Sequence, residues 1–130
     1  MADYTVKNIK ELENSAERFG LAPNVEARFA RNALGTKSSG LSYQRYAPDF
    51  RQPFAHKHSK QEEVYVILSG SARLKVDDDI VELKEWDVIR LPPGTTRQWH
   101  SGPDGFEVLA IGAPVFEESD AEMVADWWTD

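Results

Sequence analysis

The chain has 130 residues, a formal net charge of −7 and no cysteine, and 41% of its residues are hydrophobic. This length allows one domain, and the apolar content is enough for a packed core, which excludes an intrinsically disordered chain. Because the negative charge repels phosphates and no stripe of Lys and Arg offsets it, we expect no nucleic-acid partner.

The same features favour a cytoplasmic protein. Without cysteine the chain forms no disulfide, which fits a reducing compartment. The first twenty residues are polar and lack the apolar segment of a signal peptide. The longest apolar run, residues 64–68, is too short to span a bilayer, so we expect no membrane partner.

Residues 1–24 are predicted to be an N-terminal extension with a short helix or turn. Asn8 and Glu11 form a capping-box pattern at its start. The apolar residues that follow at helical spacing are Ile9, Leu12, Ala16 and Phe19.

Residues 25–113 show short β segments separated by turn residues. Turns are expected at Ser69-Gly70, at residues 77–79 and at residues 92–94. The predicted strands are 25–30, 41–47, 54–58, 63–68, 72–76, 80–83, 88–91, 96–101 and 106–112. Short strands at such regular spacing predict an all-β antiparallel barrel or jelly roll.

The acidic tail, residues 114–130, differs from the strands. Ser119 and Glu122 form a second capping-box pattern, which predicts a short helix. Its Trp127 and Trp128 are expected to pack on the barrel or, alternatively, to cover a neighbouring subunit. The acidic residues at 77–79 and 117–120 are interpreted as turn and solvated-surface residues.

His56 and His58 are two residues apart, so on a strand both side chains lie on one face. Glu63 opens the next predicted strand, where it can present a carboxylate to both imidazoles. Two His and one carboxylate suit Fe(II), Mn(II), Ni(II) or Zn(II). The alternative is a pair of ordinary, partly buried strand histidines held by hydrogen bonds.

The pattern His56-x-His58-x4-Glu63-x6-Gly70 resembles the ligand part of the first cupin motif. The segment 86–94, with its Pro-x-Gly turn, resembles the second motif. The resemblance covers roughly residues 40–113 and implies a cupin-type double-stranded β-helix. It also implies a divalent-metal site at His56, His58 and Glu63 and a homodimer.

The chain departs from the cupin pattern where the family has a further histidine ligand, because Arg97 stands there. An arginine stays protonated and is a poor metal ligand. Arg97 can form an ion pair with Glu63 and leave a metal-free pocket. It can instead hold an anionic substrate beside a metal, or turn out of the barrel. Phe50 and Trp86 stand where the family usually has glycines.

Strand alternation groups the remaining candidates. Tyr65 shares a face with Glu63, and Trp99 shares a face with Arg97, so both are candidate substrate contacts or core residues. His100 falls on the opposite face from Arg97 and is expected at the surface. The apolar residues of the face opposite Glu63 are Val64, Val66 and Leu68, and a partner or the N-terminal segment can bury them.

Three functions remain open. The first is a metal-dependent cupin enzyme, such as a dioxygenase, isomerase, decarboxylase or lyase, with Arg97 orienting a small anionic molecule. The second is a metal-free cupin that captures a small anionic ligand through Arg97, Trp99 and Tyr65. The third is an interaction module whose pocket is closed by a Glu63–Arg97 pair.

Overall fold

The computed structural model describes all residues, 1–130, and consists mainly of strands. The elements in chain order are the 3-10 turns η1 (Ile9–Glu11) and η2 (Ala16–Phe19), the short helix α1 (Arg31–Leu34), and the strands β1 (Val25–Phe29), β2 (Gly40–Tyr46), β3 (Ala55–His58), β4 (Glu62–Val76), β5 (Asp79–Lys84), β6 (Val88–Leu91), β7 (Arg97–Ala113) and β8 (Ala121–Val124). None of the helices has the length and apolar content needed to cross a membrane.

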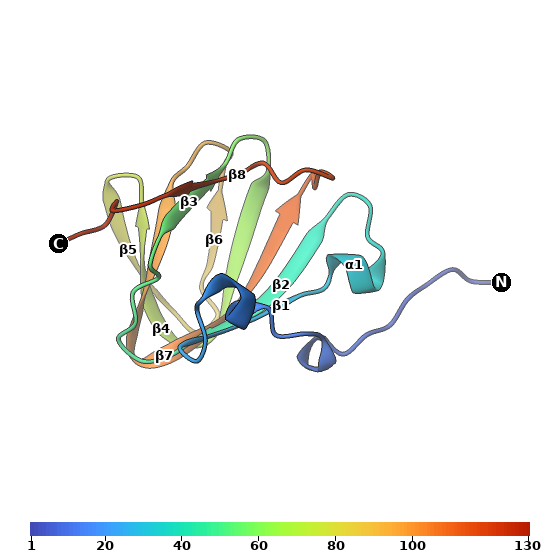
Figure 1. Cartoon of the computed structure of the whole chain (residues 1–130), viewed down its shortest axis with the longest axis horizontal. Coiled ribbons are helices and arrows are strands. Elements are labelled where there is room, and N and C mark those ends of the chain that lie inside the picture. Colours follow the sequence, from blue (N-terminus) through green and yellow to red (C-terminus); the bar gives the residue numbers. More distant parts are fainter.

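The long strands β4 and β7 pair antiparallel along most of their length and form the centre of the fold. One half of this pair continues into β2 and β1 on one side and β6 on the other. The other half continues into β5 and, through β3, into β8. The sheet curls so that the two halves face each other (Figure 1), which confirms the predicted all-β jelly-roll architecture.

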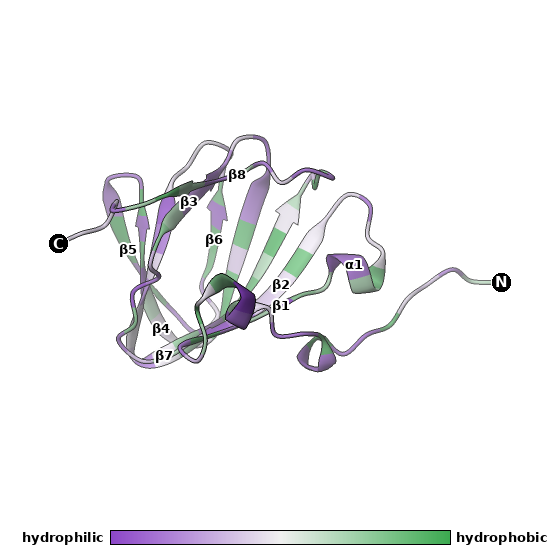
Figure 2. Cartoon of the chain, in the orientation of Figure 1, coloured by the Kyte–Doolittle hydropathy of each residue, from purple (hydrophilic) through white to green (hydrophobic).

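The core lies between the two halves, because alternate residues of the central strands point inward. Hydrophobic and hydrophilic residues alternate as bands along the central strands (Figure 2). Tyr65 and Ile67 are buried, while Val64 and Val66 on the other face of β4 stay partly exposed. The alternation predicted from Glu63 is therefore confirmed.

The turn predicted at Ser69-Gly70 is wrong, because β4 continues through it to Val76. The register between β4 and β7 shifts on both sides of Gly70, which marks an irregularity instead of a hairpin. Gly70 has a φ of 73°, and a Cβ there would collide with the carbonyl oxygen of Gly105. The glycine allows this close approach of two backbones within a strand.

The two terminal segments also differ from the predictions. Residues 8–19 form two separate 3-10 turns, and the first is capped by Asn8, whose side chain accepts a hydrogen bond from the Lys10 backbone N–H. The tail forms the strand β8 in place of the predicted helix. It pairs with β3 over residues 55–58 and lies along that strand in Figure 1.

Trp86, which replaces a glycine of the cupin pattern, adopts a φ of 70°. This left-handed conformation is strained for a residue with a side chain. The indole itself is exposed. Trp86 therefore adopts, in the turn into β6, a backbone conformation that glycine adopts without strain.

Glu26 of β1 is a buried carboxylate surrounded by three basic side chains. This cluster predicts that the free energy of unfolding depends on pH. Glu26 accepts hydrogen bonds from Arg28 at 2.6 Å and Arg45 at 3.1 Å and lies 3.4 Å from the Lys10 Nζ atom. Burial raises the pKa of Glu26, but the hydrogen bonds from the two arginines and the charge of Lys10 outweigh it and lower this pKa to about 2.

A lowered pKa in the folded protein means that Glu26 stabilises the fold above its ordinary pKa of 4.5, and that this stability is lost as the pH falls toward 2. Because Lys10 and Arg45 are about half exposed, we expect Glu26→Gln to cost only about 1–2 kcal/mol at pH 7. Urea unfolding of both proteins between pH 2 and 7 measures this. A cost that stays constant over that range would contradict the prediction.

Candidate metal centre

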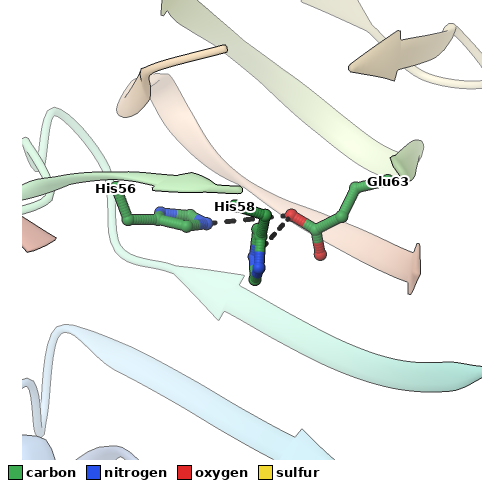
Figure 3. Close-up of side chains that lie close together, drawn as sticks. All are labelled: His56, His58 and Glu63. Atoms are coloured by element: carbon green, nitrogen blue, oxygen red, sulfur yellow. Dashed lines mark ion pairs between the residues drawn. The ribbon is translucent and has the colours of Figure 1, made fainter. Parts of the chain in front are cut away.

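His56, His58 and Glu63 come together in the structure as the sequence predicts. The two histidines project from the same face of β3, and Glu63 is the second residue of β4. Their Nε2 atoms lie 3.7 Å and 3.4 Å from one oxygen of Glu63, Oε1 (Figure 3). The candidate ligand atoms of all three residues lie within 4.8 Å of one another.

Arg97 forms the ion pair with Glu63, the first of the three arrangements considered for it. Its Nη2 atom donates to Glu63 Oε1, and its Nε atom donates to the Tyr65 hydroxyl at 3.2 Å. Its Nη1 atom donates to the Thr95 carbonyl at 2.9 Å. The Arg97 side chain is only 1% exposed. The guanidinium is thus held by protein groups on every nitrogen.

The charge states of the three candidate ligands follow from these contacts. Burial raises the pKa of Glu63, but the neighbouring His56 and His58 imidazoles and the charge of Arg97 outweigh it, so this pKa lies below its ordinary value. Burial lowers the pKa of His56. A carboxylate and a neutral imidazole are the forms that bind metal.

The pKa of His58 is the net result of opposing contributions. Burial lowers it, but the nearby Glu63 carboxylate and the hydrogen bond to Asp120 outweigh the burial and leave the pKa above its ordinary value. The neighbouring carboxylates therefore make this imidazole more basic, so a metal has to displace its proton, and the neutral ring is then the stronger electron donor. The donor set of two imidazoles and one carboxylate fits a divalent transition metal.

The three residues lie on the wall of a cavity of about 520 Å³. Tyr65 and Trp99 also line this cavity, with their ring centroids 5.2 Å apart. Arg97 is not among the lining residues, because it lies behind Glu63. A second cleft of about 500 Å³, lined by polar residues such as Arg73 and Lys84, contains none of the three candidate ligands.

His100 lies outside the candidate metal centre. It accepts a hydrogen bond on Nδ1 from Arg51 and its ring lies 5.9 Å from the Trp128 ring. Arg97 and Trp99 are buried on the inner face of β7, whereas His100 is only partly buried. The alternation along β7 is therefore regular here, as predicted, and no bulge turns His100 inward.

Comparison with known proteins identifies the family. A family profile described as the cupin domain matches residues 42–112, more than half of the chain. The chain belongs to the cupin family. An uncharacterized protein of Methanocaldococcus jannaschii is 31% identical to this cupin over 70 residues, which cover 53% of the cupin and 56% of that protein. The match thus spans little more than half of the curated relative.

Solved structures share the fold of this cupin. A cupin protein from Bacteroides fragilis is 21% identical, with a TM-score of 0.72 and coverage of 100% of this chain and 99% of that one. Pac13 of Streptomyces, a nucleoside dehydratase whose structure with uridine is known, is 17% identical (TM-score 0.72, coverage 96% and 93%). Oxalate decarboxylase from Bacillus subtilis is 22% identical (TM-score 0.74, coverage 91% and 32%). At these identities the likeness concerns the fold alone.

Asp120 is a site residue that sequence reasoning missed. Its Oδ1 atom lies 2.8 Å from His58 Nδ1, and its Oδ2 atom accepts hydrogen bonds from the backbone of Lys60 and Gln61. The interpretation of this acidic segment as solvated surface is therefore wrong for Asp120. The pairing of β8 with β3 brings it to the loop between β3 and β4.

No local pattern could have revealed this contact, because 62 residues separate Asp120 from His58. The contact fixes which imidazole nitrogen faces the cavity. With Nδ1 engaged by Asp120, the Nε2 atom of His58 is the one directed at Glu63. A carboxylate behind a ligand histidine orients the ring and raises its basicity.

Asp120→Asn is expected to weaken metal binding about 10- to 100-fold, because the amide carries no charge to support His58. Competition with a chelator of known affinity measures this. Glu122→Gln is the matched control, since Glu122 is an exposed carboxylate on the same tail and pairs with Lys57 at 3.5 Å instead of with a candidate ligand. Equal metal affinities for Asp120→Asn and the wild type would show that Asp120 has no such role.

Proposed function

We propose that this cupin binds a divalent metal, of the Fe, Mn, Ni or Zn type, through His56, His58 and Glu63. The proposal extends to a small organic molecule that binds beside the metal through an anionic oxygen. The supporting observation is the convergence of three suitable ligand atoms, within 4.8 Å of one another, on the wall of one cavity. Three protein ligands leave coordination positions open for such a molecule.

The proposed activity is that of a metal-dependent enzyme, such as a dioxygenase, isomerase or lyase. A bound metal ion supplies Lewis-acid or oxygen-activating chemistry. In this proposal Asp120 orients His58, while Arg97 and Tyr65 hold Glu63 Oε1 in place. Trp99 and Tyr65 form the wall against which the organic molecule lies.

The ion pair favours a second candidate, a metal-free cupin that binds a small molecule without catalysis. Arg97 already compensates the charge of Glu63, so the carboxylate does not need a metal to be stable in the barrel. In this alternative the two imidazoles act as hydrogen-bonding groups toward the ligand. Metal content separates the two candidates.

Metal analysis of protein purified without chelator tests the proposal. We expect close to one metal ion per chain, and its loss in the double variant His56→Ala, His58→Ala. His100→Ala is the control, because His100 lies on the outer face of β7 and should leave the metal content unchanged. Wild-type protein that stays empty after growth with added metals would contradict the metal proposal and favour the metal-free candidate.

The proposal includes a homodimer formed through the outer face of β4 and β6. Val66 pairs with Val88 across these strands, and Val64 pairs with Ile111 of β7, so four apolar side chains share one face. Val88 and Ile111 are exposed in the isolated chain. Light scattering coupled to size-exclusion chromatography should give twice the mass of the chain. The mass of a single chain at micromolar concentration would contradict the homodimer.

A further inference from the structure

The rim of the cavity carries exposed apolar side chains from three separate elements. Phe19 of η2 is 58% exposed, Phe29 of β1 is 50% exposed and Met123 of β8 is 64% exposed. All three line the cavity that contains His56, His58 and Glu63. Large apolar side chains left in water around one opening mark a surface that a ligand covers.

The polar groups of the same cavity already have protein partners. Gln44 donates to the Ser42 hydroxyl and accepts from the Tyr46 hydroxyl. Gln52 donates to the same Tyr46 hydroxyl and accepts from the Trp99 backbone N–H. A ligand rich in hydroxyl groups would therefore find these amides engaged, and its own polar groups would lose water without replacement.

The lining also offers little free positive charge. Arg31 is the one arginine or lysine that lines the cavity, and its Nη1 atom donates to the Phe116 carbonyl at 2.9 Å. Arg97 lies behind Glu63 and does not reach the cavity. A metal ion at His56, His58 and Glu63 would therefore be the strongest attachment point for an anionic group, with Arg31 as the one cationic side chain elsewhere in the lining.

More than half of the lining residues are hydrophobic, and the cavity volume suits a molecule of drug size. We propose that the ligand of this cavity is an organic acid with an aromatic or aliphatic body. The oxygen-bearing head lies at the metal end, and the body lies against Phe19, Phe29 and Met123. This inference rests on the proposed function for the head group only, since the body contacts need no metal.

Calorimetric titration with paired probes tests the inference. In metal-supplemented protein, 3-phenylpropanoate should bind about tenfold or more tightly than propanoate, because its ring buries apolar surface at the rim. Oxalate and uridine should bind more weakly than 3-phenylpropanoate. Phe29→Ala and Met123→Ala should each weaken 3-phenylpropanoate about three- to tenfold and leave propanoate unchanged. Ile80→Ala is the control, because Ile80 is an exposed apolar residue of β5 that does not line the cavity.

The neutral amides of the same two acids separate this inference from the proposed function. Suppose that 3-phenylpropanamide binds more tightly than propanamide, that each acid binds no more tightly than its amide, and that the protein holds no metal. The metal proposal then fails, and the inference of a ligand with an apolar body stands. If 3-phenylpropanoate and propanoate bind equally tightly to metal-loaded protein, the inference of an apolar body is wrong and the metal proposal stands. Tighter binding of uridine than of 3-phenylpropanoate, or no binding of any probe, would also overturn the inference.

Discussion

Arg97→Met is expected to lower the free energy of unfolding of the metal-free protein by about 3 kcal/mol, because it leaves the Glu63 carboxylate in the barrel without a cationic partner. The loss is large since Arg97 is 1% exposed and the Glu63 side chain is 12% exposed, so water cannot replace the guanidinium. The hydrogen bonds from Arg97 to the Tyr65 hydroxyl and the Thr95 carbonyl are lost as well. Urea unfolding followed by circular dichroism measures the change.

A double-variant cycle distinguishes the ion pair from simple packing. Glu63→Gln together with Arg97→Met removes both charges and leaves an amide and an unbranched apolar side chain in their places. Because the single substitutions each leave one unpaired charge, we expect the double variant to recover most of the loss, about 2 kcal/mol. If the stability loss of the double variant equals the sum of the two single losses, the two side chains contribute independently of each other.

Trp128→Ala is expected to lower the free energy of unfolding by about 3 kcal/mol and to weaken metal binding at the same time. Trp128 is buried, and the Arg51 guanidinium lies 4.0 Å from its ring centroid. The Arg73 guanidinium lies over the same ring at 5.5 Å. Since Trp128 secures the tail that carries Asp120, its loss should release the contact between Asp120 and His58.

Trp127→Ala provides the matched control for this prediction. Trp127 is the neighbouring residue and has the same side chain, but it is only partly buried and contacts Lys75 at 4.6 Å. Its removal should cost less than about 1 kcal/mol and leave metal affinity unchanged. Equal effects of the two substitutions would show that Trp128 does not anchor the tail.

The part of the site that the sequence predicted depends on short-range geometry. His56 and His58 share a face because a strand alternates every two residues, and Glu63 follows after one short loop. Eight residues, 56–63, contain the whole set, so strand alternation and one short loop were enough to bring the three side chains together. The contact between Arg97 and Glu63 needed the pairing of β4 with β7, and the sequence left it as one of three arrangements.

The part that could not be predicted depends on partners distant in the chain. Ser119 and Glu122 match a helix-capping pattern, but β3 offers an edge whose backbone groups need partners, and residues 121–124 satisfy them as a strand. Gly70 matches a hairpin turn, but the close approach of Gly105 keeps it within β4. In both places a long-range pairing overrides the local signal.

The most direct test of the metal centre is an anomalous-scattering measurement on crystals soaked in Mn²⁺. We expect one strong anomalous peak bounded by the Nε2 atoms of His56 and His58 and by the Glu63 carboxylate. Crystals that take up no Mn²⁺ there, with the Arg97–Glu63 ion pair intact, would contradict it. A peak at His100 alone would contradict it as well, since that residue lies on the outer face of β7.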